Sequence, residues 1–331
     1  MDFDMNQCRL RGFAKTLVHD EDQITGSMST LIQSVGLGGL KPNTMLISWP
    51  VHERGSSESS DSEYNTFTAC AMDMCLLVAK GIIDFPSSVF KLTGFIDVYW
   101  IVQDGGLCLL MAYLLKQHKV WRGCKLRIIA IAQENDNNLK MQTELQQYVY
   151  QLRIDAKILI VELADPEISK NAFERTLLME ERTMVLKQMQ EARSGGSGQT
   201  RGVSPLVTAE QRDKSGSKSG DDKGESKSEN GEKTPDEESV ADDHKKEKTM
   251  KEKLRALDRT KVHKMHTAVR LNELIIEHSL NSQLVLLNLP KPPRGKEGLG
   301  DYIHYLEVLS DKINRVIFVR GTGKEVITTH S

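Results

Sequence analysis

Apolar and polar residues follow one another along the chain in blocks that predict strands and helices in turn. The clearest block, residues 96–119 (IDVYWIVQDGGLCLLMAYLLKQHK), predicts a strand, a tight turn at Asp104–Gly106 and a helix. Its first part is continuously apolar, which is typical of a strand covered on both faces in a parallel sheet. Its polar turn makes it too short for a transmembrane helix. In the second part, apolar residues at spacings of three and four predict a buried helical face. That face consists of Leu107, Leu110, Met111, Leu114 and Leu115.

The same patterns recur on both sides of this block and predict an α/β fold. Continuous apolar runs predict strands, and longer runs with a helical period predict helices between them. Thr267 is a suitable residue to cap the helix that follows it. The strands are expected at Gly12–Val18, Thr44–Trp49, Cys124–Ala132, Lys157–Leu163, Gln283–Leu289 and Arg315–Val319, and the helices at Ser29–Val35, Phe67–Lys80, Asn138–Leu152, Ser169–Gln190, Thr267–His278 and Tyr302–Ile313.

Residues 194–255 interrupt this alternation. Glycine, serine, lysine, aspartate and glutamate dominate most of the stretch, and it contains no aromatic residue. Such a composition cannot bury enough apolar surface to offset the entropy of ordering, so we predict a disordered insertion. The strands after it are again continuously apolar and need cover on both faces. We therefore expect them to complete the sheet begun before the insertion.

Composition excludes several functional classes. The 44 lysines and arginines nearly balance the 46 aspartates and glutamates, so overall charge gives no reason to expect nucleic-acid binding. Five scattered cysteines without a CxxC pair favour reduced, buried thiols over disulfides or a zinc site. The acidic N-terminus is unlike a signal peptide. We expect a cytoplasmic piece of a longer protein.

The sequence offers no catalytic or metal-binding motif. The glycines at Gly36–Gly39 follow a predicted helix, so they favour a helix end over a phosphate loop. The turn at Asp104–Gly106 follows a strand, where α/β sheets bind ligands, but it lacks a second chemical partner. The nine histidines do not pair with cysteines or acids at ligand spacing, and no GxSxG elbow occurs. We predict that the protein is not an enzyme.

Accessible hydroxyl groups are the remaining candidates for a functional site. Ser204 and Thr234 each precede a proline in the predicted insertion. Thr176 lies in the charged helix before it, next to Arg175 and among several glutamates. A phosphate adds up to two negative charges, which would repel those glutamates and loosen the helix.

Long segments of the sequence resemble the C-terminal cytosolic domain of potassium-chloride cotransporters, which belong to the cation-chloride cotransporter family. The resemblance covers both ends and most of the ordered parts of the chain. The segments that carry it are GFAKTLV, LIQSVGLGG, IDVYWIVQDGGLCLLMAYLLKQHKVWRGCKLRI, FERTLLMEERTMVLKQM, MHTAVRLNELI, LVLLNLPKPPRG, YLEVL and RVIFVRGTGKEVITTHS.

The resemblance implies a regulatory domain that dimerises and is attached to a transmembrane domain of the same polypeptide. It implies two subdomains related to universal stress proteins. We place the first at residues 1–92, where the family's first strand is missing, and the second at residues 93–331, interrupted by the insertion at 194–255. The family's inhibitory phosphothreonine in a YERTL-like motif falls on Thr176, in FERTL. Serine/threonine kinases and phosphatases are then the implied partners, at the cytoplasmic face of the plasma membrane.

Some relatives bind ATP or ADP in the first subdomain, which leaves a second function open. Lys41, Gly38 and Gly39 occupy positions where the family could face phosphates. The loop after the first predicted strand reads HDEDQ, where basic residues would be needed, so we expect nucleotide binding to be weak or absent. The alternative function is a nucleotide-binding α/β sensor or enzyme of the stress-protein type.

Overall fold

The chain divides into two compact units in a computed structural model. One unit comprises Met1–Phe173 with Thr260–Ser331, and the other comprises Glu174–Arg259. Most of the predicted insertion and the predicted strand Gly12–Val18 fall outside the residues that the structure describes. The described residues are 12, 27, 30–32, 34–35, 42–49, 74–101, 105–133, 136–163, 168–194, 258–293 and 298–323.

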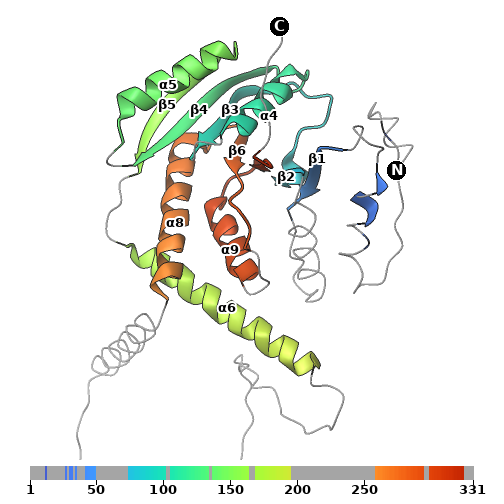
Figure 1. Cartoon of the computed structure of the whole chain (residues 1–331), viewed down its shortest axis with the longest axis vertical. Helices are drawn as coiled ribbons and strands as arrows, with labels where there is room; N and C mark the ends of the chain where they lie inside the picture. The colour runs from blue at the N-terminus through green and yellow to red at the C-terminus, as the bar shows by residue number, and fades with distance from the viewer. Residues whose placement is uncertain are drawn as a thin grey trace, which may run out of the picture. The chain divides into compact units, whose positions relative to one another are not determined.

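The described strands of the first unit form one seven-stranded sheet in the order β1-β2-β7-β6-β3-β4-β5 (Figure 1). Five neighbouring strands, from β7 to β5, run parallel to one another. The pair β1 and β2 is also parallel, and β2 joins β7 in the antiparallel sense. The strands are β1 Thr44–Ser48, β2 Cys75–Lys80, β3 Thr93–Trp100, β4 Gly123–Gln133, β5 Ala156–Leu163, β6 Leu284–Asn288 and β7 Val316–Arg320.

Helices cover the two faces of the sheet and create two apolar cores. One core lies under α4 and α5 and receives Ile96 and Val98 of β3, whereas the other lies under α8 and α9 and receives Tyr99. Successive strand residues point to opposite faces, so continuous apolar runs are needed to fill both cores. The helices are α4 Gly106–Gln117, α5 Asn138–Gln151, α8 Arg259–Ser279 and α9 Leu299–Leu309, with a short 3-10 helix, η3, at Ile82–Asp84.

Polar contacts join α8 to α9, which lie side by side in Figure 1. The amide nitrogen of Asn272 donates to the carbonyl oxygens of Leu309 and Asp311, both at 3.0 Å. The Lys261 ammonium lies 3.1 Å from an Asp301 carboxylate oxygen. The two helices are therefore fixed to each other as one layer.

These elements confirm the α/β fold, with a mainly parallel sheet flanked by helices, that the sequence predicted. Strands were expected at the positions of β1, β3, β4, β5, β6 and β7, and each is present within a few residues of its expected bounds. The strands that follow the insertion, β6 and β7, do join the sheet that precedes it. The subdomain boundary near residue 92 stays a prediction.

The predicted helix Phe67–Lys80 is wrong over its second half, because Cys75–Lys80 is strand β2. Four of its six residues are buried, and it lies between β1 and β7 in the sheet. A short apolar run buried on both sides has no period that distinguishes a strand from a helix. The helical spacing of Phe67, Ala71, Met74 and Val78 therefore does not indicate a helix at Val78, which lies in β2.

Two further helix predictions need correction. Thr267 does not cap α8, which begins at Arg259; its hydroxyl donates to the His263 carbonyl oxygen (3.0 Å) inside the helix. The buried face of α4 consists of Cys108, Leu109 and Ala112, and Leu114 is exposed. Leu107, Met111 and Leu115 of the predicted face are partly buried and do pack against the core under α4 and α5.

Candidate functional site

Thr176, the sequence-predicted phosphorylation site, lies in α6, which spans Lys170–Ser194. The Ser169 hydroxyl accepts a hydrogen bond from the Ala172 backbone N–H (3.3 Å), as a cap does. The buried residues Ala172, Thr176 and Met179 follow one another at spacings of four and three, so they share one face of the helix. Thr176 has an exposed fraction of 0%.

The burial of Thr176 determines what its modification would do. A phosphate carries up to two negative charges and needs water or cationic partners. Placed on a face formed with Ala172 and Met179, it would lose its hydration without gaining such partners from those two side chains. Phosphorylation of Thr176 therefore disfavours the buried position of this face.

Thr183 provides a comparison on the same helix. It lies seven residues after Thr176, is half-buried, and its hydroxyl donates to the Met179 carbonyl oxygen (2.9 Å). Backbone bonding of this kind is a usual way for a helical threonine to satisfy its hydroxyl. The two threonines have the same chemistry but differ in burial.

The other sequence-predicted site residues lie outside the described residues. These are the hydroxyl candidates Ser204 and Thr234 and the nucleotide candidates Lys41, Gly38 and Gly39. The structure does not test their roles, which stay predictions. Of the predicted turn at Asp104–Gly106, the described part consists of the two glycines at the start of α4.

The carboxyl ends of β3 and β6 mark the point where the order of the parallel strands reverses. Open α/β sheets bind ligands at such a point. Here protein groups meet one another: the Cys108 thiol of α4 donates to the Asn288 side-chain oxygen of β6 (2.7 Å). Burial raises the pKa of Cys108 to about 12, so this thiol stays protonated and unreactive.

Trp100 and Gly105 close the same position from the side of β3. A Cβ atom on Gly105 would lie 2.3 Å from a ring carbon of Trp100, so the ring packs directly on the glycine backbone. The Trp100 ring also meets Tyr148 of α5 edge to face, with ring centres 5.7 Å apart. The glycine at this turn is therefore needed for packing, which supports the structural interpretation made from the sequence.

A buried ion pair that sequence reasoning missed lies on the face of the sheet covered by α8. Arg127 of β4 donates from Nε and Nη2 to the two carboxylate oxygens of Asp97 of β3, at 2.7 and 2.6 Å. Arg127 Nη2 also donates to the His278 carbonyl oxygen at 3.0 Å, and the Ser282 hydroxyl donates to Asp97. The pair fastens the end of α8 to the sheet.

A signal for this pair was present in the sequence. Asp97 interrupts an apolar strand, Arg127 interrupts the next, and the two residues are direct partners in the β3–β4 register. A charged residue inside a buried strand needs a partner of opposite sign. Because Asp97 and Arg127 satisfy each other, we interpret them as structural.

The described residues contain neither a metal-binding cluster nor a membrane-spanning helix. In those residues, no group of three or more histidine, cysteine, aspartate or glutamate side chains is placed to hold a metal ion. The helices described contain no segment long and apolar enough to cross a membrane. The three described cysteines, Cys75, Cys108 and Cys124, are buried and form no disulfide with one another.

Comparisons with known proteins identify the family. The protein named potassium/chloride cotransporter 3 of Caenorhabditis elegans is 43% identical over 335 residues, which cover 99% of this chain and 31% of that protein. This chain thus spans about a third of the length of that relative. A crystal structure of the cytoplasmic domain of a prokaryotic cation chloride cotransporter matches 45% of this chain and 56% of its own, with a TM-score of 0.30 and 18% identity. The family model of solute carrier family 12 matches residues 52–331, and the chain therefore belongs to solute carrier family 12.

Proposed function

We propose that this chain is the cytosolic regulatory part of a potassium-chloride symporter. The observation that carries this proposal is the 43% identity, over 99% of the chain, to a protein named as a potassium/chloride cotransporter. The chain would act through the transmembrane domain of the same polypeptide, at the cytoplasmic face of the plasma membrane. It would not itself transport ions or catalyse a reaction.

Phosphorylation of Thr176 is the proposed control. The burial of Thr176 supports a two-state mechanism: the unmodified helix keeps its Ala172–Thr176–Met179 face buried, and the phosphorylated helix cannot. A kinase would act on the population in which α6 has loosened, and the phosphate would hold it there. A phosphatase would allow the face to be buried again.

We expect opposite effects from two replacements of Thr176. The chain, placed in the matching region of the nematode cotransporter, should give chloride-dependent thallium influx that is at least about fivefold lower with Thr176→Glu than with Thr176→Ala. That ratio is the low end of the usual coupling between two sites. Glutamate introduces a charge on the buried face, whereas alanine removes the hydroxyl that a kinase would modify.

Thr183 is the matched control for this experiment. Thr183→Glu and Thr183→Ala change the same residue type on the same helix at a less buried position, so they should differ from each other by less than about twofold. Equal influx for Thr176→Glu and Thr176→Ala would contradict the control mechanism. A similar effect at both threonines would show that helix stability, not Thr176 itself, determines transport.

The same proposal includes Ser/Thr kinases and phosphatases as partners at Thr176, and it includes self-association. The family resemblance implies that this domain forms a homodimer. Sedimentation equilibrium of the purified chain measures it directly, because a dimer has twice the mass of 37.2 kDa calculated from the sequence. A monomer at micromolar concentration would contradict the proposed dimer.

We expect ATP to bind weakly or not at all. The first subdomain has the acidic loop HDEDQ where phosphates would need basic residues, and the position where the parallel strands reverse is occupied by the Cys108–Asn288 hydrogen bond and by Trp100 packed on Gly105. Isothermal titration of the chain with ATP should therefore give a Kd weaker than about 1 mM, corresponding to less than about 4 kcal/mol of binding free energy. A micromolar Kd would favour the alternative, a nucleotide-binding sensor.

A further inference from the structure

We propose that the connection between β2 and β3 docks on an anionic phospholipid surface. The docking surface, here called the amino-edge patch, consists of the apolar side chains Ile82, Ile83, Val89 and Phe90 with a basic rim. This inference goes beyond the proposed control by phosphorylation and does not depend on it. It follows from the exposure of these side chains, their anchoring and the charge around them.

Four large apolar side chains gather in this short connection and point into solvent. Their exposed fractions are 51% for Ile82, 92% for Ile83, 85% for Val89 and 63% for Phe90. Single exposed apolar residues are normal on protein surfaces, but a group of this kind marks an interaction site. Burying these side chains in the boundary of a bilayer would remove most of their apolar surface from water.

The patch is held firmly against the amino ends of the parallel strands. Arg315, next to β7, donates from Nε to the Asp84 carbonyl oxygen (2.6 Å). The Leu92 backbone N–H donates to the Val120 carbonyl oxygen (2.7 Å), and the Phe85 ring lies 6.3 Å from the Trp121 ring between centres. The exposed side chains are thus presented by an anchored segment.

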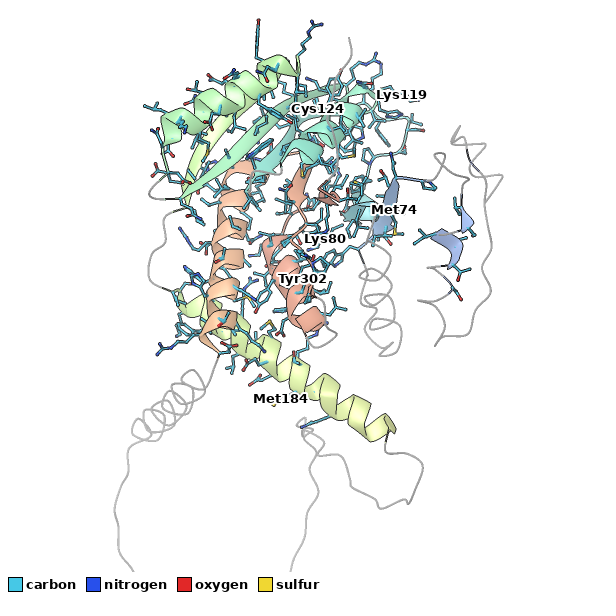
Figure 2. The ribbon with its side chains drawn as sticks, in the orientation of Figure 1. Met74, Lys80, Lys119, Cys124, Met184 and Tyr302 are labelled. Carbon is cyan, nitrogen blue, oxygen red and sulfur yellow. The ribbon has the colours of Figure 1, made fainter. Side chains whose placement is uncertain are left out.

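The segment that carries the patch and the segment bonded to it are rich in basic residues. Residues 81–92 and 116–125, which the Leu92–Val120 bond joins, contain five lysines and arginines and a single acid, Asp84. In Figure 2, Lys119 lies where the chain leaves α4, close to the connection between β2 and β3. Each basic residue near an anionic membrane contributes about 1 kcal/mol of attraction. The basic residues are Lys91, Lys116, Lys119, Arg122 and Lys125.

The sign of this charge favours a lipid surface over a second copy of the chain. Two copies meeting through the patch would bring two basic rims together, which opposes association. An anionic bilayer has the complementary charge, and its headgroup layer accepts apolar tips beside lysine and arginine stems. The amino-edge patch therefore fits phosphatidylserine-containing membranes best.

Vesicle flotation of the full 331-residue chain tests this proposal. The chain should float with vesicles of phosphatidylcholine mixed with phosphatidylserine and should remain unbound with phosphatidylcholine alone. Ile83→Asp combined with Phe90→Asp should lower the partition coefficient by at least about tenfold, because two apolar side chains no longer insert. Lys91→Glu combined with Lys119→Glu should lower it by at least about thirtyfold, because two attractions of about 1 kcal/mol each are lost.

Matched variants on α5 serve as controls. Leu139→Asp with Tyr150→Asp replaces two side chains that are 78% and 82% exposed but lie outside the patch, and it should leave flotation unchanged. Thermal unfolding should be unchanged in every variant, since all the altered side chains are exposed. Three results would each overturn the proposal: no flotation of the wild type, equal flotation of patch and control variants, or patch variants that lose only self-association in sedimentation velocity.

Discussion

Replacing Arg127 by alanine is expected to lower the free energy of unfolding by about 3–5 kcal/mol, the usual cost of leaving one buried charge without its partner. Asp97 is fully buried, and both of its carboxylate oxygens accept hydrogen bonds from Arg127. Urea denaturation followed by tryptophan fluorescence measures the loss, because Trp49, Trp100 and Trp121 lie on or beside the sheet.

An exposed ion pair provides the control for this prediction. Lys140 lies 3.8 Å from Glu144 on α5, and the two side chains are 73% and 67% exposed. Lys140→Ala should therefore cost no more than about 0.5 kcal/mol. The double variant Asp97→Leu with Arg127→Met should lose less than Arg127→Ala, since no charge is then left unpaired. A loss below about 1 kcal/mol for Arg127→Ala would contradict the structural role of the pair.

Replacing Gly81 by alanine is expected to cost at least about 3 kcal/mol, because two unfavourable effects combine. Gly81 has a φ of +76°, where a side chain costs about 1–2 kcal/mol. A Cβ atom there would also lie 1.9 Å from the Asn314 carbonyl oxygen, a backbone atom that cannot move away alone. The midpoint of urea denaturation should fall accordingly.

Two other glycines separate these two effects. Gly323 has a φ of +81° with no atom within 4 Å of an added Cβ, so Gly323→Ala should cost only the conformational term, about 1–2 kcal/mol. Gly300 lies in α9 with open space around it, and Gly300→Ala should stabilise the protein by about 0.5–1 kcal/mol. Equal losses at Gly81 and Gly323 would show that the clash with Asn314 is relieved.

The sequence predicted the sheet better than the helices because a buried strand has a stronger local signal here than a helix boundary. Residues 316–319 (VIFV), for example, are apolar and buried throughout, which leaves few alternatives between turn residues. The start of α8 was missed because Arg259–His266 is rich in charge and reads as solvated. Val262, Met265 and His266 are nevertheless buried, and α9 lies beside this part of the helix. Such burial depends on tertiary packing that no local pattern reports.

The candidate site was predictable only in part. Thr176 was found through its FERTL motif, and its position in a helix was expected from the spacing of its neighbours. Its complete burial was not expected, because the helix around it is highly charged and its apolar stripe is narrow. To predict the Asp97–Arg127 pair, one would need the register between β3 and β4, because the two residues are 30 positions apart in the sequence. To predict the amino-edge patch, one would need to know that the apolar connection between β2 and β3 stays exposed after folding.

The position of β7 has a consequence for synthesis of the chain on the ribosome. β7 is the last described strand along the sequence, yet it lies between β2 and β6. Until Arg320 has emerged from the exit tunnel, β1 and β2 lack the only strand, β7, that joins them to the other four in the described sheet. During synthesis, β1 and β2 are therefore exposed and accessible to chaperones until β7 has been made and can pair with β2.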